Sequence, residues 1–230
     1  VFNGTGANVV ALQAGLKRWQ AVICVESAHI HADEGGAPEK MGGIKLWTVA
    51  SPNGKLTPEL IDSQVFDMGF VHRAQPGVVS ITQTTEMGTL YTAKEIKALA
   101  ARAHKHGLLL HMDGARLSNA AAALKLSFKQ FTTDVGVDLV SLGATKIGAL
   151  AAEAVIITDS KSARGKELAN AMPFLRKTSM QLPSKMRFVS AQLLALFEND
   201  ARVALTNARH ANAMAKRLYE GVVQISKKHK

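Results

Sequence analysis

Residues 108–116 read LLLHMDGAR and residues 139–148 read LVSLGATKIG, and in both segments an apolar run stops at polar residues and glycines. Such runs are typical of buried strands. If the two strands are parallel neighbours, their carboxyl ends bring Asp113, Arg116 and Lys146 to one rim of the sheet. Open α/β sheets bind their ligands at this rim, so the two segments predict a ligand site there.

Apolar, β-rich runs alternate with helical patterns along most of the chain. Their nearly continuous hydrophobicity is typical of strands that are covered on both faces. Repeated strand, helix, strand units with right-handed crossovers predict an α/β fold with a mostly parallel, doubly wound sheet. The expected strands cover residues 21–26, 45–49, 78–82, 108–112, 139–142 and 154–157.

Helix-start signals stand between the expected strands. Thr92 and Glu95 form a capping-box pattern, which predicts a helix running toward His106. Pro58 is well suited to the first turn of another helix, which we expect to continue through Met68.

After residue 182 the pattern is helical only. Residues 183–200 and 202–219 carry apolar residues at helical spacing. We expect residues 1–182 to form one large domain, and residues 183–230 to form a helical linker and the start of a smaller, incomplete domain.

Composition restricts the class of protein. The chain has 230 residues, 47% of them hydrophobic, and a formal net charge of +10. Its lysines are scattered along helices, apart from the basic tail at residues 227–230, so we favour a basic surface over a nucleic-acid site. The single cysteine, Cys24, excludes an internal disulfide and fits a reducing compartment. No apolar stretch approaches ~20 residues and no signal-peptide pattern is present, so we expect a cytoplasmic protein without membrane contact.

The rim residues have a simple and a functional interpretation. Asp113 alone fits a cap for a helix that starts near Ala115. Lys146 lies between glycines after an apolar strand, so we expect it to be semi-buried, unlike lysines on polar helix faces. An aspartate, a lysine and an arginine on one rim suit pyridoxal 5'-phosphate, with its pyridinium nitrogen, its aldehyde and the carboxylate of its substrate.

Two further segments carry polar groups that fit this interpretation. Gly4, Thr5 and Gly6 precede a helix-like stretch, residues 9–17, and are either a phosphate cradle at its positive end or a plain N-cap. His29 and His31 follow the first strand. A metal site there lacks a second ligand cluster, so we predict no metal, whereas a histidine at a strand end is suited to stack on an aromatic cofactor.

The chain resembles the threonine aldolase and aromatic amino acid β-eliminating lyase family of fold-type I enzymes that use pyridoxal 5'-phosphate. The resemblance covers almost the whole chain. It implies a three-layer fold around a mostly parallel sheet. The matching segments, in family order, are NGTGANVVAL, ESAHIHADEGGAPE, GKLTPELI, SITQTTEMGTLYT, LHMDGARLSNA, SLGATKIGALAAEAVI and PFLRKTSMQLPSKMRFVSAQLLAL.

The resemblance implies catalytic roles for three residues: Lys146 forms a Schiff base with the cofactor, Asp113 pairs with its pyridinium nitrogen, and His29 stacks on its ring. It implies substrate-binding roles for two residues: Arg116 binds the substrate carboxylate, and Glu34 is a partner near His29. The other cofactor contacts implied are those of Gly4, Thr5, Gly6 and Thr145, with Gln83 and Arg176 as weaker candidates.

The activity implied is cleavage of L-threonine or L-allo-threonine to glycine and acetaldehyde by a homodimer or homotetramer. One alternative is another lyase of the same cofactor class, acting by β-elimination on an amino acid. A second alternative, from a different class, is a cofactor-free basic protein that binds nucleic acid.

The chain departs from the family pattern in two respects. The loop after residue 82 reads Thr84, Thr85, Glu86 and lacks the histidine that aldolases often carry there. The base for the β-hydroxyl proton is therefore open between His29, His31, Glu86 and a bound water. We also expect the chain to be a fragment, without the amino-terminal segment and the complete small domain of the family.

Overall fold

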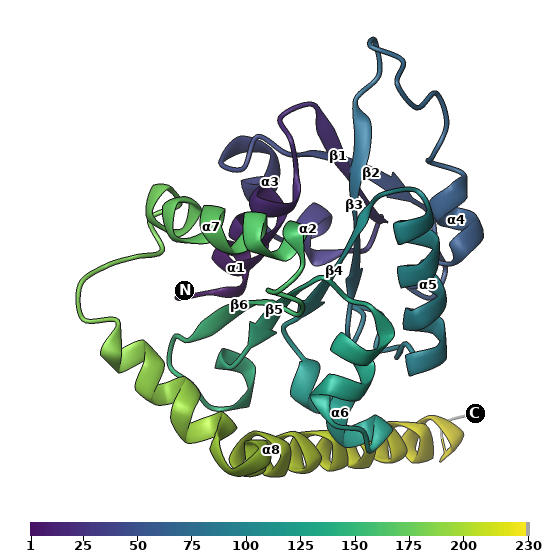
Figure 1. Ribbon diagram of the computed structural model, residues 1–230. Coiled ribbons are helices and arrows are strands. Elements are labelled where there is room, and N and C mark those ends of the chain that lie inside the picture. Colours follow the sequence, from purple (N-terminus) through teal and green to yellow (C-terminus); the bar gives the residue numbers. More distant parts are fainter. Residues whose placement is uncertain (229–230) are drawn as a thin grey trace.

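A six-stranded sheet organises the computed structural model, which describes residues 1–228 (Figure 1). The strand order is β2-β1-β3-β4-β5-β6. Neighbours from β2 through β5 pair in parallel, and β6 pairs antiparallel with β5. The predicted α/β fold with a mostly parallel sheet is therefore confirmed. The strands are β1 (Gln20–Val25), β2 (Lys45–Val49), β3 (Gln75–Thr82), β4 (Leu109–Gly114), β5 (Leu139–Gly143) and β6 (Glu153–Ile157).

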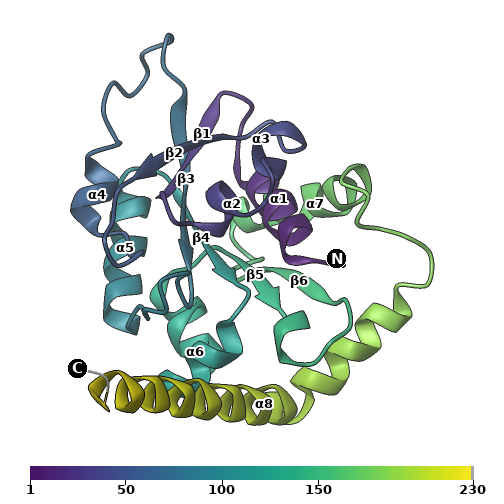
Figure 2. The same cartoon turned by 180° about the vertical axis from the view of Figure 1, so that it is seen from behind.

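Helices cover both faces of this sheet, which gives three layers. One face carries α1 and α7, and the other carries α4 and α5 (Figures 1 and 2). The helices are α1 (Gly4–Gly15), α2 (His29–Ala32), α3 (Ala37–Lys40), α4 (Pro58–Asp62), α5 (Ala93–Lys105), α6 (Leu117–Leu124), α7 (Ala163–Thr178) and α8 (Arg187–Lys228), with 3₁₀ turns η1 (Phe128–Phe131), η2 (Thr133–Val135) and η3 (Thr145–Ile147).

Strand β4 is longer than the sequence predicts. We expected it to end at Met112, but Asp113 pairs with Thr82 on one side and Ser141 on the other. The backbone of Asp113 therefore belongs to the ladder, and only its side chain is free to act. All six residues of β4 are buried, as expected for a central strand covered on both faces.

Two helices have other bounds than predicted. Helix α1 begins at Gly4, within the segment read as a loop, because the Asn3 side chain accepts the Gly6 N–H (2.7 Å) and caps the first turn. Helix α4 ends at Asp62, with Ser63 as its C-cap, and not at Met68. The predicted continuation is not helical, and within it Asp67 adopts a left-handed conformation (φ 52°). The capping box at Thr92 is confirmed in α5.

Helix α8 consists of two helical arms. Its backbone leaves the helical region at Glu198–Ala201, close to the break between the two predicted segments. The second arm lies along α6, where the Asn119 side chain donates to Asn212 (2.9 Å) and the Asn212 side chain donates back to the carbonyl of Asn119 (3.0 Å). A domain boundary at residue 182 remains a prediction. Residues 229–230 of the basic tail lie outside the described residues.

Cys24 lies in β1 and is fully buried. Burial, with help from the charges of Glu39 and Glu86, raises the pKa of its thiol to about 12. Across residues 1–228, none of the helices has the length and apolar composition that crossing a bilayer requires.

His111 joins the three central strands below the rim. One ring nitrogen lies 2.9 Å from the hydroxyl of Ser80 on β3, and the other lies 3.0 Å from the hydroxyl of Ser141 on β5. Burial lowers the pKa of the imidazole to about 4, against the opposing charge of Asp113. The folded protein therefore holds this ring neutral at pH values where an unfolded chain protonates it.

We expect His111 to make the fold less stable as the pH is lowered from 6.5 to about 4, whereas the raised pKa values of Glu34, Glu86 and Glu153 act in the opposite direction. The unfolded chain gains the His111 proton near 6.5 and the folded chain only near 4, so acid favours unfolding, by about 3 kcal/mol over this range. Melting temperatures of the wild type and His111→Gln, measured across this range, test the assignment. The variant should lose less stability toward acid than the wild type, and His31→Asn, at an exposed position, is the matched control. Parallel profiles for all three proteins would contradict it.

Candidate functional site

A cavity of about 400 Å³ opens at the carboxyl ends of the strands. Its volume lies in the usual range of small-molecule sites. It borders the point where the strand order reverses, between β1 and β3, at which open α/β sheets bind ligands. Eight of the ten predicted site residues line it, namely Gly4, Thr5, His29, Glu34, Asp113, Arg116, Thr145 and Lys146.

The amino end of α1 forms one wall of the pocket. The first amide groups of a helix have no partner within the helix, and they carry the positive end of its dipole. Gly4 and Thr5 line the cavity, and a side chain on Gly4 would meet no atom within 4 Å. The wall is therefore open and suited to an anionic group such as a phosphate.

Gly6 faces away from this opening. Its N–H is used by the Asn3 cap, and a Cβ at Gly6 would lie 2.4 Å from the side-chain amide of Gln181. Gly6 therefore allows close packing behind the helix end and does not line the cavity.

A chain of hydrogen bonds joins four residues that line the pocket. Nδ1 of His29 lies 3.0 Å from Oε1 of Glu34, and the same oxygen accepts from Nδ2 of Asn8 (2.8 Å). Nδ2 of Asn8 also donates to Oδ2 of Asp113 (2.9 Å). The side chain of Glu34 is fully buried, and burial raises the pKa of its carboxyl, with a smaller contribution from Asp113 against the hydrogen bonds from Asn8 and His29.

Asp113 stands at the end of β4 with both carboxyl oxygens occupied. Oδ1 accepts the N–H of Ala115 (3.0 Å), and Oδ2 accepts from Asn8. Helix α6 starts only at Leu117, after Arg116 as its N-cap, so Asp113 fixes the preceding turn and is not the cap of this helix. Arg116 is half-buried and also lines the pocket.

Lys146 lies in the short turn η3 and lines the same cavity as the amino end of α1. It is exposed, so the expectation of semi-buried surroundings was wrong. The turn has only three residues and lies at the rim of the sheet. Of these residues only Ile147 is buried by the rest of the described chain. Behind the turn, the buried carboxylate of Glu153 accepts the N–H of Thr145 (3.3 Å), and burial raises the pKa of Glu153 against these hydrogen bonds.

Glu86 supplies another carboxyl group to the pocket. Its Oε1 accepts the backbone N–H of His29 (3.2 Å), whereas Oε2 is buried and has no hydrogen-bond partner within the described chain. Burial is the main cause that raises the pKa of this carboxyl, and the nearby Asp113 adds to the effect. A carboxyl group of this kind is suited to take up and release a proton.

Other candidates lie outside the cavity. Gln83 is buried, and its amide is engaged with the backbone of Tyr91 in both directions (2.8 and 3.0 Å). His31 is exposed on α2 and does not line the pocket. Arg176 does not line it either, although its Nε is buried.

Asn8 and Glu153 are pocket residues that the sequence reasoning missed. Asn8 carried a usable signal, because it follows Thr5 by three positions and Gly4 by four, which places all three on one face of a helix. Because we expected the helix to start only at residue 9, this spacing was not used as evidence. Glu153 carried no such signal in the sequence. Its hydrogen bond with Thr145 depends on the antiparallel pairing of β6 with β5.

Two glycines let the strand ends approach each other. A Cβ at Gly143 would lie 2.6 Å from the Cα and carbonyl oxygen of Ala115, and a Cβ at Gly114 would lie 2.8 Å from the carbonyl oxygen of Ser141. Both distances are shorter than any side chain tolerates. These glycines therefore keep the Asp113 turn and the Lys146 turn side by side.

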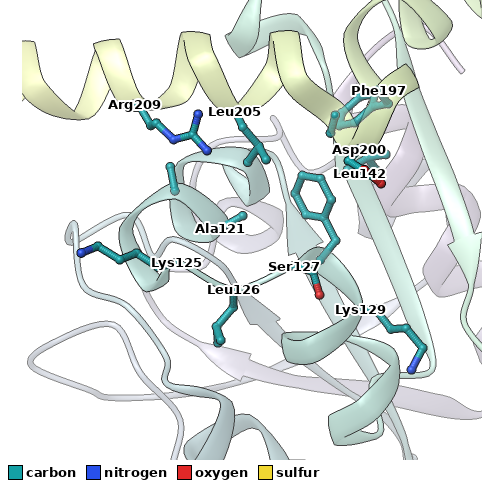
Figure 3. Close-up of a pocket in the computed structure, with 13 residues that line it drawn as sticks. Ala121, Lys125, Leu126, Ser127, Lys129, Leu142, Phe197, Asp200, Leu205 and Arg209 are labelled. Carbon is teal, nitrogen blue, oxygen red and sulfur yellow. The ribbon is translucent and has the colours of Figure 1, made fainter.

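A larger cavity, of about 650 Å³, lies between α6 and α8 (Figure 3). Its lining is mainly apolar, with Leu126, Phe197 and Leu205, and Lys125 and Arg209 stand at its edge. None of the predicted site residues contributes to it. Carboxyl, imidazole and amine groups gather instead in the smaller cavity at the strand ends.

The fold is that of a fold-type I protein, and the pocket lies at the carboxyl ends of its strands. An aspartate aminotransferase from Thermus thermophilus has the same fold, with a TM-score of 0.71 at 17% identity, over 98% of this chain and 56% of that one. The profile of the family described as beta-eliminating lyase matches residues 1–229. The chain belongs to this family, whose members depend on pyridoxal 5'-phosphate.

Relatives with assigned names are similar over nearly the whole chain. A low specificity L-threonine aldolase from Pseudomonas sp. (strain NCIMB 10558) is 42% identical over 97% of this chain and 63% of its own length. A solved threonine aldolase from Leishmania major is 32% identical with a TM-score of 0.88, again over 97% and 63%. The chain thus spans less than two thirds of the length of these relatives.

We expect Gly143→Ala to destabilise the fold by about 1–3 kcal/mol, because its methyl group overlaps the backbone of Ala115. Urea unfolding curves measure the effect. Gly221→Ala, on α8 with no atom within 4 Å of the added methyl, is the matched control and should be neutral or stabilising, by up to about 1 kcal/mol. Equal stability of Gly143→Ala and the wild type would contradict the proposed close approach.

Proposed function

We propose that this chain is the cofactor-binding part of a threonine aldolase that uses pyridoxal 5'-phosphate and cleaves L-threonine or L-allo-threonine to glycine and acetaldehyde. One observation carries the proposal: Asp113, Lys146 and the open amino end of α1 line a single cavity. The names of the relatives from Pseudomonas and Leishmania major support the substrate class.

The chemistry of the pocket fits the cofactor. The amino end of α1, with Gly4 and Thr5, is suited to hold the phosphate. Asp113 is suited to pair with the protonated ring nitrogen, and Lys146 supplies the amine that an aldehyde requires. His29, with a side chain that is 32% exposed, offers a flat face to an aromatic ring. Thr145 lies beside Lys146 on the same rim.

The chain's residues bind and orient the reacting groups. The guanidinium of Arg116 holds the substrate carboxylate, and this fixes which bond at Cα breaks. When bound, the cofactor supplies an electron sink for the pair released from the Cα–Cβ bond. Asp113 keeps the ring nitrogen protonated. Glu34 holds the His29 ring in place through the hydrogen bond at Nδ1.

Glu86 takes the β-hydroxyl proton in this proposal. Among the four possibilities left open by the sequence, His31 does not line the pocket, and His29 is assigned in this proposal to stack on the cofactor ring. Glu86 lines the pocket and carries a buried, unpartnered oxygen within the described chain. Removal of the proton releases the aldehyde, and a proton returned to Cα completes glycine.

A β-elimination reaction on another amino acid is the second candidate. The family name and the histidine-free loop at Glu86 favour it. The family match and the pocket chemistry leave no support for a cofactor-free nucleic-acid-binding protein. A cytoplasmic homodimer or homotetramer is part of our proposal, supported by the family resemblance and the single buried thiol.

Replacement of Lys146 by alanine should abolish turnover, together with the visible absorbance of the cofactor-loaded protein, because no other group can take over the amine's covalent role. Spectra and product assays with threonine test this. Lys125→Ala, on the rim of the other cavity, is the matched control. Glycine and acetaldehyde formed by the Lys146 variant at the wild-type rate would refute the proposal. A keto acid formed from serine or threonine by the wild type, without glycine, would favour β-elimination.

Replacement of Glu86 by glutamine should lower kcat for threonine by about 100-fold or more with little change in KM, because the amide binds but accepts no proton. The raised pKa of Glu86 should give the wild type a loss of rate on the acid side at a pH above the usual glutamate range, and the variant should lack it. Glu39→Gln, exposed on α3, is the control. An unchanged kcat for Glu86→Gln would exclude this role.

A further inference from the structure

Asn8 connects two buried carboxyl groups in the wall of the pocket. Its Nδ2 donates to Oε1 of Glu34 (2.8 Å) and to Oδ2 of Asp113 (2.9 Å). The three residues come from α1, from the segment after α2 and from β4, and each is less than 8% exposed. One side-chain amide therefore joins three separate parts of the fold.

When both are ionised, the carboxyl groups of Glu34 and Asp113 repel each other. Both accept from the same nitrogen, so they lie close together, and little water reaches them to screen their charges. Each hydrogen of the Asn8 amide group offsets one carboxyl. The orientation of the amide follows from this, because a flipped amide would turn its oxygen toward two acceptors.

The other end of the Asn8 amide, Oδ1, is buried and makes no hydrogen bond within the described chain. An unpaired buried acceptor costs about 1–3 kcal/mol, which an apolar residue at this position would avoid. The cost indicates that the two donated bonds, and not the filling of space, are the reason for an amide here.

We propose that Asn8 is a positioning residue that sets the orientation of the Asp113 carboxylate toward the ring nitrogen of the cofactor. The N–H of Ala115 holds Oδ1 of Asp113, and Asn8 holds Oδ2, so together they fix the plane of the carboxylate. Through Glu34, the same amide is linked to Nδ1 of His29. This inference rests on the proposed function, since it takes the cofactor as the ligand.

The test compares two ligands that differ at the ring nitrogen alone. The protein freed of cofactor is titrated by calorimetry with pyridoxal 5'-phosphate and with its 1-deaza analogue, in which carbon replaces that nitrogen. We expect Asn8→Leu to raise the Kd for pyridoxal 5'-phosphate by about tenfold or more, and the Kd for the analogue by less than about twofold, because only the former has a nitrogen for Asp113 to meet.

Gln13→Leu is the matched control. It removes an amide from the same helix, where Gln13 bonds to the carbonyl of Gly42 and to Ser179, away from Asp113. It should change neither Kd. If Asn8→Leu does not fold, Asn8→Ser makes the same comparison, because a hydroxyl has one hydrogen and cannot serve both carboxyl groups.

The outcomes separate this inference from the proposed function. Equal weakening of both ligands, or an unchanged Kd for pyridoxal 5'-phosphate, would overturn the role of Asn8 while the proposed function stands. A wild-type protein that does not bind pyridoxal 5'-phosphate at all would overturn the proposed function and this inference with it.

Discussion

The parallel pairing of β4 with β5 is the constraint on which the rest of the structure depends. It sets Asp113 opposite Ser141, and it brings the turn after each strand to the same rim. Glycines at 114 and 143 remove the side chains that would separate the two turns. A carboxylate and a lysine that are 33 positions apart in sequence thereby meet across one cavity. Backbone geometry comes first in this site, and the functional side chains follow from it.

A second feature of the site is the number of carboxyl groups that are buried around the cavity. Glu34, Glu86 and Glu153 are held around the cavity, and burial raises the pKa of each of them. Such an arrangement costs stability unless protons, amide donors or a cationic ligand offset the charge. The fold provides amide donors from Asn8 and from the backbone of His29 and Thr145. A protonated heterocycle beside Asp113 fits the same electrostatic pattern.

Local signals in the sequence predicted the strands and most of the rim. Apolar runs that end at polar residues located the ends of β4 and β5, and with them Asp113 and Lys146. Contacts between distant segments were not predictable in this way. The bond from Asn8 to Asp113 needs α1 to begin at Gly4, which depends on the Asn3 cap. The exposure of Lys146 depends on which atoms cover a turn, and the engagement of Gln83 with Tyr91 depends on how one loop folds back. No local sequence motif predicts either of these two features.

The burial of Cys24 has a practical consequence. Only the thiolate attacks alkylating and disulfide reagents, and a thiol with a pKa of about 12 in a closed core is almost never in that form near neutral pH. Because Cys24 is also the one cysteine in these 230 residues, we expect this folded chain to react very slowly with such reagents. A cysteine introduced on an exposed helix would be its single reactive handle, so a fluorophore or spin label can be attached at one chosen point without first removing a native residue.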